Sequence, residues 1–421
     1  MATYGSYKDS GVKWLGQIPS HWEVKKLRAF FDRRNQKVSD KDFAPLSVTK
    51  NGVLPQMENV AKSKDSENRR LVKKGDFVIN SRSDRKGSSG VSLLEGSVSF
   101  VNTIMTPHDN IISPYSNYLL KSYSFVEENY RNGHGIVADL WTTSFDEQKH
   151  IYLAVPSVSE QDAIVKYLDK VTVDIDRAIE AQQKLIDALN QRKQIIITNA
   201  VTKGLNPDAP LRDSGIDWLG QIPQHWKVIQ LRRISKIKTG KTPPTSNPDF
   251  YENPDITWYT PGDFNLSSIY LKNSERKLDN RAKKEISLFP KNSVLMVGIG
   301  GTLGKIGYTD LECFSNQQIN AIIPDKNCDG RFLAYFLSSI SEIIKGTANA
   351  ATLPILNQDC NKRILVLLPP KIEQQEIISF IEMQISPLED SISNCEKLIA
   401  LLQERKQIII NEMVTGKKKV I

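Results

Sequence analysis

Cysteine and histidine are scarce in this chain, and their placement argues against several classes of protein. Of 421 residues, four are cysteine and five are histidine. The cysteines lie in the second half without a C-x-x-C pair, at Cys313, Cys328, Cys360 and Cys395. Disulfide scaffolds and zinc sites need more regular spacing. We therefore expect reduced thiols and no metal ligands in this chain.

Long apolar runs are also missing. Residues 1–30 contain no apolar signal core, and no run of 18 apolar residues occurs anywhere in the sequence. A secreted precursor would need the first feature and a membrane-spanning helix the second. The expected location is the cytoplasm.

Complete catalytic motifs are missing as well. Residues 297–305 (VGIGGTLGK) suggest a phosphate-binding loop, but Ile299 stands where its first glycine belongs and Ile306 replaces its Ser/Thr. Residues 147–149 (EQK) look like the end of a nuclease carboxylate–lysine motif without its upstream Pro-Asp. No methyltransferase motif of the type N/D-P-P-Y/F occurs, and residues 368–371 (LPPK) read as a strand-to-helix turn. We expect no catalytic residue and no bound cofactor in this chain.

The overall composition is that of a globular protein with a basic balance. Hydrophobic residues make up 39% and charged residues 25%, and the length allows two to four domains. The net charge is +8 and the pI about 9.0. This favours a polyanionic partner, although many soluble proteins are mildly basic, so charge alone leaves both readings open.

A 19-residue segment occurs twice. Residues 184–202 (KLIDALNQRKQIIITNAVT) return 213 residues later at 397–415 (KLIALLQERKQIIINEMVT), with 12 of 19 positions identical. A period above 200 residues is too long for a solenoid repeat. It indicates two domain-sized halves, each closed by the same helix.

A second repeat opens each half. Residues 9–28 and 213–232 share 14 of 20 positions at an offset of 204. Pro19 and Gly16 favour a tight, irregular packing element. Tryptophan can stack on bases, but one copy per half favours a docking core, with His21 and His225 as packed or surface residues. The tryptophans concerned are Trp14, Trp22, Trp218 and Trp226.

Each half ends in a long amphipathic pattern that favours helix pairing close to a heptad seam. The helices are predicted to begin near Glu160 and Glu373, each followed by glutamine. Pro387 leaves open whether the second helix is continuous or restarts or kinks there. The residues predicted to form the pairing are Leu168, Ile175, Ile179, Leu185, Leu189, Ile381, Leu388, Ile392, Leu398 and Leu402.

Topology makes the predicted pair antiparallel. Between the opening repeat and the helix of each half lies a region that diverges strongly between the halves, called variable region 1 and variable region 2. The first helix leaves variable region 1 and leads to variable region 2, so a second helix that pairs with it must run back. About 40 helical residues would span ~60 Å and place the two variable regions at opposite ends of a rod. A one-turn insertion after Leu189 is expected to lengthen this separation.

The variable regions read as mixed. Residues 71–80 and 289–297 suggest a turn followed by a strand, residues 91–101, 320–323 and 365–368 suggest strands, and residues 115–130 and 332–344 suggest helices. The expected fold is α+β, with two mixed α/β domains, two long antiparallel helices forming a coiled coil, and internal pseudo-two-fold symmetry. The expected limits are 1–155 for the first domain, 156–204 for helix 1, 205–368 for the linker and second domain, and 369–421 for helix 2.

The whole arrangement resembles the specificity subunit of a Type I restriction–modification system. WLGQIPSHW and WLGQIPQHW resemble the motif that opens each target-recognition domain of that family, and EQ followed by RKQIII resembles its conserved helical regions. Residues 239–243 (TGKTP), 258–263 (WYTPGD) and 316–320 (NQQIN) resemble landmarks of the recognition domains. Variable region 1 lacks the W-x-T-P-G-D stretch, so these landmarks are not carried over to it.

This resemblance implies a non-catalytic, DNA-binding subunit of a prokaryotic cytoplasmic complex. Each recognition domain would read one half of a bipartite double-stranded DNA target, and the helices would set the unspecified spacer. The subunit would dock two methyltransferase subunits, which methylate adenine N6 from S-adenosylmethionine, and restriction subunits that use ATP and Mg²⁺.

Residues able to contact DNA are those that bind phosphates or base edges. Each is as well explained by a solvated loop or a buried hydrogen-bonded turn. The candidates in region 1 are Arg69, Arg70, Lys73, Lys74, Arg82, Arg85, Lys86, Ser88 and Ser89. Those in region 2 are Lys238, Lys241, Thr242, Trp258, Tyr259, Thr260, Lys305, Asn316, Gln317 and Gln318.

Three alternatives remain beside this reading. The chain would be the specificity subunit of a related bipartite-site restriction–methylation system, a nuclease or methyltransferase in its own right, or a coiled-coil scaffold that binds proteins. The missing motifs argue against an enzyme. A scaffold explains the helices but neither the basic balance nor two divergent domains.

Overall fold

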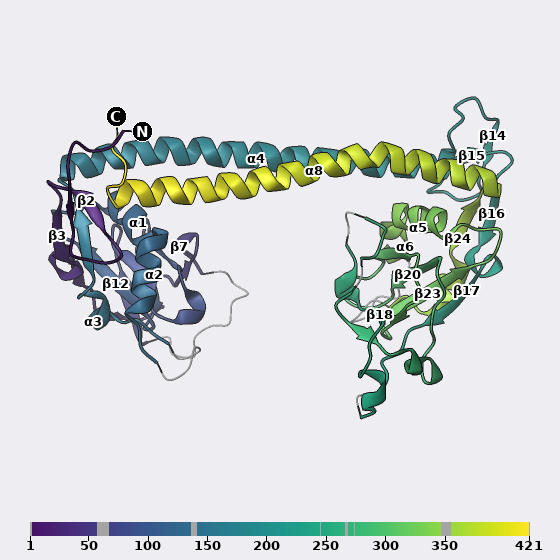
Figure 1. Cartoon of the computed structure of the whole chain (residues 1–421), viewed down its shortest axis with the longest axis horizontal. Helices are drawn as coiled ribbons and strands as arrows, with labels where there is room; N and C mark the ends of the chain where they lie inside the picture. The colour runs from purple at the N-terminus through teal and green to yellow at the C-terminus, as the bar shows by residue number, and fades with distance from the viewer. Residues whose placement is uncertain are drawn as a thin grey trace. The chain divides into compact units, whose positions relative to one another are not determined.

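The chain forms two compact units in a computed structural model that describes residues 2–56, 67–135, 141–244, 246–265, 268–272, 274–346 and 355–420. Unit 1 comprises residues 1–182 and 397–421, and unit 2 comprises residues 183–396 (Figure 1). The two long helices therefore contribute one part to each unit.

Unit 1 is built mainly of short antiparallel strands. Its strands are β1 (Tyr7–Asp9), β2 (Gln17–Pro19), β3 (Glu23–Lys26), β4 (Phe31–Arg33), β5 (Lys37–Val38), β6 (Leu46–Thr49), β7 (Gly52–Pro55), β8 (Arg69–Val72), β9 (Phe77–Asn80), β10 (Ser89–Val91), β11 (Gly96–Ser99), β12 (Asn102–Pro107) and β13 (Tyr152–Val155). Its short helices are α1 (Ser113–Lys121), α2 (Tyr123–Arg131) and α3 (Phe145–Gln148).

The frame of unit 1 is a four-stranded sheet in the order β10-β9-β12-β4, with the pairs β1-β2 and β3-β13 beside it. A smaller sheet, β11-β8-β5, lies next to the hairpin β6-β7. Helix α1 packs on β9 and β10 and buries Tyr115 and Leu119 against Phe77. Burial of large side chains such as Trp22 and Phe125 supplies the main driving force for this core.

Unit 2 repeats this frame in the same order. Its strands are β14 (Leu211–Asp213), β15 (Gln221–Pro223), β16 (Lys227–Gln230), β17 (Ser235–Thr239), β18 (Ile256–Tyr259), β19 (Lys277–Leu278), β20 (Ser293–Val297), β21 (Ile306–Thr309), β22 (Phe314–Ser315), β23 (Ile319–Pro324) and β24 (Leu365–Leu368). Its short helices are α5 (Gly330–Ser339), α6 (Ser341–Gly346) and α7 (Gln358–Arg363).

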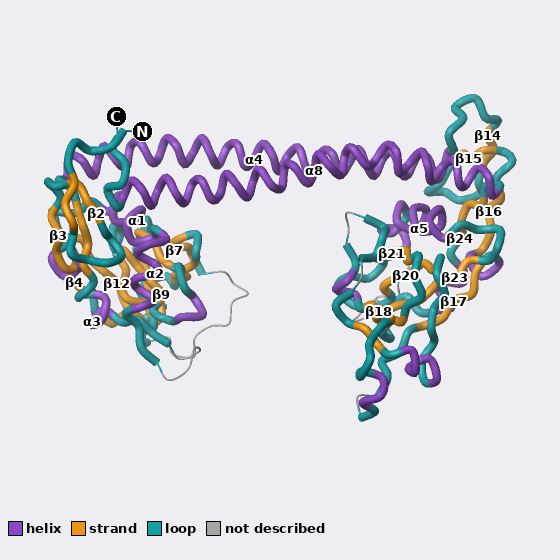
Figure 2. The backbone as a smooth tube through the Cα atoms, in the orientation of Figure 1, coloured by secondary structure: helices purple, strands orange, loops and turns teal. Residues whose placement is uncertain are grey.

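The sheet β21-β20-β23-β17 of unit 2 matches β10-β9-β12-β4 of unit 1 in strand order, and β14-β15 and β16-β24 match β1-β2 and β3-β13. Figure 2 shows the strands of each unit with short helices beside them. The second sheet differs, because β19-β18-β22 contains a parallel pair, β18 with β22, that the small sheet of unit 1 lacks among its described strands.

The long helices α4 (Val158–Lys203) and α8 (Lys371–Val414) pack side by side and antiparallel (Figure 1). In unit 1 the start of α4 contacts the end of α8, with Leu168 and Met413 in one core. In unit 2 the end of α4 contacts the start of α8, with Val201 and Ile381 in one core. The α+β class and the pair of long antiparallel helices are thus confirmed.

Several details differ from the sequence-based predictions. The expected strand at residues 91–101 is divided between β10, β11 and a turn, because Ser92 and Leu94 close a turn through the Ser92 hydroxyl. On a point that the sequence left open, helix α8 runs without interruption through Pro387, and Ser391 donates a hydrogen bond to the Pro387 carbonyl at 2.8 Å.

The buried stripe of the helix pair is also narrower than predicted. Leu168, Ile175, Ile381 and Ile392 are buried, and Ile179, Leu189, Leu388 and Leu402 are half-buried. Leu185 and Leu398 are 46% and 42% exposed, because the stripe passes through Ile186, one residue later than predicted in the first helix. Those two leucines therefore belong to the outer surface.

Candidate nucleic-acid interface

The first turn of each long helix contains a glutamate whose carboxylate contacts the His-Trp pair of the duplicated segment. In unit 1, Trp22 Nε1 donates to Glu160 Oε1 at 3.2 Å, and Tyr4 Oη donates to the same oxygen at 2.7 Å. His21 Nε2 lies 2.9 Å from Glu160 Oε2. The next residue, Gln161, donates to the carbonyls of Asn110 and Pro156. The side chain of Trp22 is fully buried, so it serves docking and is not available for stacking on bases.

Unit 2 makes the same Trp, His and Gln contacts with its own copies. Trp226 Nε1 donates to Glu373 Oε1 at 3.0 Å, and His225 Nε2 lies 2.8 Å from Glu373 Oε2. Gln374 donates to the carbonyls of Asn327 and Pro369 and accepts from the amide of Asp329. Buried polar groups need such partners. The duplicated segment thus fastens each globular domain to the start of a helix, and Trp218, at 41% exposure, is the copy left open.

Three sequence landmarks of unit 2 converge on one place. Gly240 donates its amide to the Ile319 carbonyl, and Lys241 donates to the Ser315 carbonyl at 2.9 Å each. A Cβ at Gly240 would overlap the Ser315 hydroxyl and the Asn316 carbonyl oxygen, so glycine is required at this approach. Asn316 in turn donates its amide to the Tyr259 carbonyl at 3.0 Å. Residues separated by more than 50 positions in sequence therefore meet at one place in the fold.

Side-chain contacts support the same convergence. Thr242 Oγ1 donates to Gln317 Oε1 at 2.8 Å, and Thr239 Oγ1 donates to Asn320 Oδ1 at 2.8 Å. Gln318 and Asn316 bond to each other, and Asn316 is 8% exposed. Asn316 therefore forms the buried hydrogen-bonded turn, whereas Thr242 and Gln317 lie at the exposed rim.

The aromatic candidates of unit 2 are buried or half-buried, so they contribute to the packing of the domain. Tyr259 is 2% exposed, and burial, with the nearby Cys313, raises the pKa of its hydroxyl to about 12. Trp258 is half-buried against a small apolar cluster, and its indole nitrogen meets no hydrogen-bond partner within the described ranges. Thr260 caps the following turn with Asp263 and accepts from Arg276 Nη1 at 2.8 Å.

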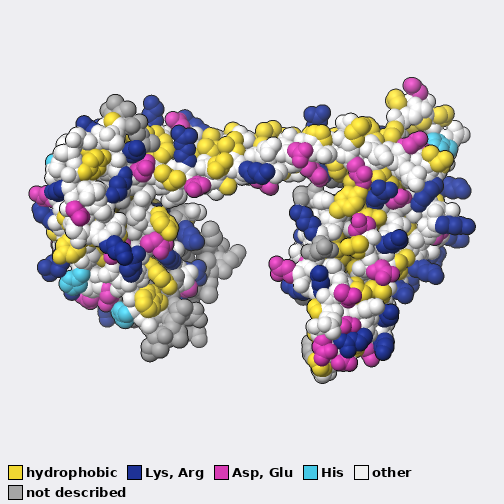
Figure 3. Space-filling model, viewed as in Figure 1, with side chains coloured by type: hydrophobic (Ala, Val, Ile, Leu, Met, Phe, Trp, Pro, Cys, Tyr) yellow, Lys and Arg dark blue, Asp and Glu magenta, His cyan; other side chains and the backbone are white. Residues whose placement is uncertain are grey.

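A basic strip lies along the edge strand β17. Lys238 and Lys241, both predicted candidates for DNA contact, are exposed. Lys236 lies on the same strand face as Lys238 and is also exposed. Arg232 and Arg233 precede this strand and are exposed as well. Figure 3 shows Lys and Arg side chains gathered over this edge of unit 2. Lys236 was not among the predicted candidates, although its alternation with Lys238 in SKIKT is a signal for it.

The glycine-rich segment of unit 2 is a hairpin turn. It joins β20 to β21, and Gly304 donates to the Val297 carbonyl at 2.9 Å. A Cβ at Gly298 would lie 2.7 Å from the Asn320 side chain. The helix that a phosphate-binding loop needs does not follow, because the strand β21 comes next. Lys305 donates to the Phe264 carbonyl at 3.3 Å.

The corresponding loop of unit 1, after β9, is charged. Arg82 and Arg85 side chains are 51% and 66% exposed and share the carboxylate of Asp84. Lys86 pairs with Glu127 at 2.8 Å and lies 4.4 Å from the Tyr130 ring centroid, so it positions the loop. The other loop candidates, Ser88 and Ser89, are buried.

The paired arginines of β8 differ from each other. Arg69 is 4% exposed and donates twice to Ser97 at 2.8 Å, and burial lowers its pKa. Arg70 is half-buried, and its Nε and Nη1 have no hydrogen-bond partner among the described residues. Burial, then the neighbouring Arg33, lowers its pKa. Lys73 and Lys74 are exposed in the turn before β9. Arg69 is therefore part of the fold, while Arg82, Arg85 and the two lysines are accessible.

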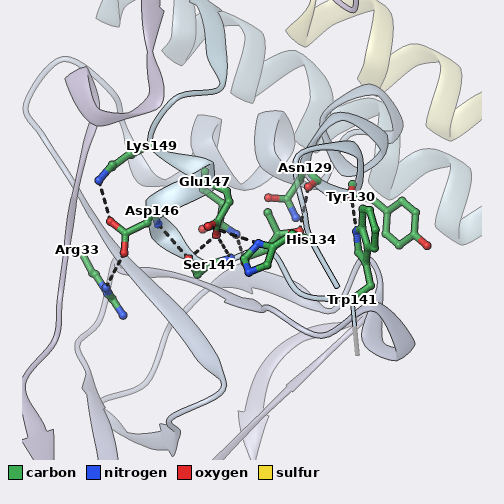
Figure 4. A network of polar contacts seen from close by, with 11 residues as sticks. Arg33, Asn129, Tyr130, His134, Trp141, Ser144, Asp146, Glu147 and Lys149 are labelled. Carbon is green, nitrogen blue, oxygen red and sulfur yellow. Dashed lines mark hydrogen bonds and ion pairs between the residues drawn. The ribbon is translucent and has the colours of Figure 1, made fainter. Parts of the chain in front are cut away.

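The carboxylate–lysine pattern at residues 147–149 is a helix cap. Glu147 accepts from the amide of Ser144 at 2.8 Å in a capping box (Figure 4). Partial burial opposes ionisation, but the bonds from Ser144 lower the pKa of Glu147 below its usual value. Lys149 pairs with Asp146 at 2.7 Å. These contacts give Glu147 and Lys149 structural roles.

Neither metal ligands nor a membrane segment was found in the described ranges. Over these residues, three or more His, Cys, Asp or Glu side chains never gather as a metal ion would require. The same part of the chain has no helix both long and apolar enough to cross a membrane.

Comparison with known proteins identifies the architecture. The family model described as "Type I restriction modification DNA specificity domain" matches residues 223–399. A sequence named as the type I restriction enzyme MjaX specificity subunit of Methanocaldococcus jannaschii is 23% identical over 98% of both chains. Residues 223–399 thus match a type I specificity domain, and the chain is similar over nearly its whole length to a type I restriction–modification specificity subunit.

Further specificity subunits and one solved structure agree with this assignment. The HindI specificity subunit of Haemophilus influenzae is 27% identical over 46% of this chain and 42% of its own. A chain from a solved type I R-M system has a TM-score of 0.69 at 14% identity, covering 95% of this chain and 99% of that one, which supports the fold. Specificity subunits are the non-catalytic DNA-recognition components of such systems. The two globular domains of this chain are accordingly called recognition domain 1 and recognition domain 2, in unit 1 and unit 2.

Proposed function

We propose that this specificity subunit recognises a bipartite DNA target, one half-site for each recognition domain. The observation that carries the proposal is a duplicated frame with unlike exposed surfaces. The sheet order and the His-Trp docking contacts recur in both units, whereas the loop after β9 is charged and the loop after β20 is rich in glycine. Two different surfaces on one frame suit two different half-sites.

The proposed DNA-contacting face of recognition domain 2 combines the β17 strip with the convergent landmarks. Lys236, Lys238 and Lys241 would hold phosphates, and the exposed Thr242 and Gln317 would lie near base edges. In recognition domain 1, Arg82 and Arg85 would take the corresponding role, with Lys73 and Lys74 as phosphate contacts.

The partners are proposed from a duplicated outer stripe on the helices. In α4, Leu185 and Ile195 are 46% and 60% exposed, and the equivalent Leu398 and Ile408 of α8 are 42% and 49% exposed. Apolar side chains at such spacing on one helix face fit partner helices. Because the stripe occurs twice, it fits two copies of a methyltransferase subunit, with restriction subunits joining that core.

The chemistry would belong to those partners. The methyltransferase subunits would use S-adenosylmethionine to methylate adenine N6, and the restriction subunits would use ATP and Mg²⁺. The complex would act in a prokaryotic cytoplasm. The paired helices would set the spacer between the half-sites.

Salt-dependent DNA binding by the complex with its methyltransferase tests the proposed phosphate contacts. The variant Lys236→Gln/Lys238→Gln should bind more weakly, and the slope of log affinity against log salt should fall by about 0.9 for each lost contact. Lys166→Gln, in which a charge is removed from the exposed surface of α4, is the matched control. An unchanged slope in the double variant would place the DNA elsewhere.

A further inference from the structure

Each long helix carries a lysine inside the stripe along which the two helices touch. Lys193 is 8% exposed and stands seven residues after Ile186 and seven before Ala200, which are both buried. Lys406 occupies the equivalent position of α8, 213 residues later, and is half-buried. A charged residue in an apolar heptad stripe costs stability unless a partner meets it.

Both lysines are met by a carboxylate of the opposite helix. In unit 2, Lys193 Nζ pairs with Glu389 Oε1. In unit 1, Lys406 Nζ lies 2.7 Å from both carboxylate oxygens of Asp176. Asp176 and Glu389 are themselves equivalent positions, 213 residues apart. The two bridges thus join the same two positions of the repeat, so both copies specify one antiparallel register.

Seven residues before each carboxylate stands another, with a different partner. Tyr118 Oη of recognition domain 1 donates to Asp169 Oδ1 at 2.7 Å. Tyr270 Oη of recognition domain 2 donates to Glu382 Oε1. Asp169 and Glu382 are also 213 residues apart. Each helix therefore has one carboxylate that holds its recognition domain and a second, two turns along, that holds the other helix.

Alternative registers lose these partners. A shift of α8 by three residues would set Lys193 and Lys406 against Ile392 and Ile179, burying charge against apolar side chains. A seven-residue shift in one direction would bring them to Glu382 and Asp169, where the tyrosines already bind. The apolar stripe alone tolerates such shifts, because leucine and isoleucine recur along it, whereas a polar residue in a seam fixes register.

We propose that Lys193–Glu389 and Lys406–Asp176 are register contacts, positioning residues that select one alignment of the helices and hence one spacer length. The inference rests on the proposed spacer function. A slip of one helical turn moves one helix by ~5.4 Å along the other. This exceeds the ~3.4 Å rise of a base pair, so the register decides the separation of the half-sites.

The test uses Lys193→Met/Lys406→Met in the complete complex with the methyltransferase. Methionine keeps an apolar stripe, and the released carboxylates retain solvent access, with side chains 40% and 58% exposed. Both half-sites should still be methylated. The rate of methylation at targets whose spacer differs from the wild-type length should rise about tenfold or more. Wild-type spacer selectivity in this variant would overturn the proposal.

Two further variants guard against trivial explanations. Reversing both bridges, with Lys193→Glu/Glu389→Lys and Lys406→Asp/Asp176→Lys, should restore a single spacer length, and a broad spacer range would contradict the register role. Lys166→Met/Asp162→Met removes an exposed pair within α4, with side chains 75% and 52% exposed, and should leave spacer choice unchanged. Broadening by this control as well would also overturn the proposal.

A second readout separates this inference from the proposed function. Spin labels at Gln191 and Asp390, both exposed, would report the register directly in a Cys360→Ser background, since the other cysteines are buried. One narrow distance is expected for the wild type and several for the lysine double variant. If the wild type methylates no bipartite target but the labels respond as expected, the spacer function fails and the register contacts stand. One narrow distance in both proteins would contradict the register role of the two bridges and leave the proposed spacer function standing.

Discussion

Recognition domains 1 and 2 share a frame but differ in what they expose. The order β10-β9-β12-β4 and its match in unit 2 are held by the same buried contacts, including Trp22 on Glu160 and Trp226 on Glu373. The second sheet is antiparallel in unit 1 and contains a parallel pair in unit 2. The loop after β9 carries Arg82 and Arg85, whereas the matching loop after β20 carries glycines.

This difference separates two physical roles. Contacts that dock a domain on a helix are buried and must keep their hydrogen-bond partners, so both copies retain the same residue types. Exposed loops tolerate substitution and can change their chemistry without loss of the frame. Divergence is therefore concentrated where DNA would be read.

Exchanging the domains has the largest expected effect. Replacing residues 27–151 by residues 231–364 keeps β3 and β13 and gives both ends the second recognition surface. We expect a target with two copies of the second half-site, because recognition belongs to the exposed surfaces. Mapping methylated sites with the partner methyltransferase measures this. Retention of the original first half-site would assign recognition to the frame.

Gly240→Ala should affect recognition domain 2 alone. Its Cβ would overlap the Ser315 hydroxyl and the Asn316 carbonyl, so the convergent landmarks must separate at a cost of about 1–3 kcal/mol. Thermal unfolding and binding to DNA with either half-site scrambled would measure the change. Gly262→Ala is the matched control, since its nearest neighbour is Thr260 Oγ1 at 3.9 Å. Equal effects of both variants would contradict the requirement for glycine at position 240.

Arg82→Gln/Arg85→Gln should relax recognition of the first half-site only. The loss expected for each arginine that reads a base is about 1–3 kcal/mol. Competition binding with substitutions in one half-site at a time measures it. Equal weakening at all sequences would indicate phosphate contacts instead, and a change at the second half-site would break the assignment of loops to domains.

Glu160→Gln and Glu373→Gln should lower stability, Glu160→Gln somewhat more. Glu160→Gln weakens contacts with Trp22, His21 and Tyr4, and Glu373→Gln weakens contacts with Trp226 and His225. Glutamine keeps an oxygen that can accept, so the loss should stay below the about 1.5–3 kcal/mol of a hydrogen bond to a charged group. Urea unfolding measures the loss. The bases recognised should stay the same in both variants, and altered specificity in either would show that docking and recognition are coupled.

The sequence was enough to predict the frame because duplication marks buried, constrained positions. Lys184 to Thr202 and its copy indicated the paired helices, and the Glu-Gln pairs indicated where they begin. Continuity through Pro387 was not predictable, since packing against the partner helix overrides the local preference of proline.

The exposed DNA-contact candidates were harder to predict from the sequence than the frame. Arg69 and Arg82 both read as basic residues near strand ends, but one faces Ser97 in the interior and the other faces solvent. Only tertiary packing separates them. The convergence of Gly240, Asn316 and Tyr259 likewise depends on strand pairing between distant segments.

The most direct test of two unlike surfaces on one duplicated frame is a genome-wide map of methylation by this chain with its methyltransferase partner. The account predicts one target made of two different short blocks separated by an unspecified spacer of constant length. A contiguous target, two identical blocks, or methylation without sequence preference would contradict it.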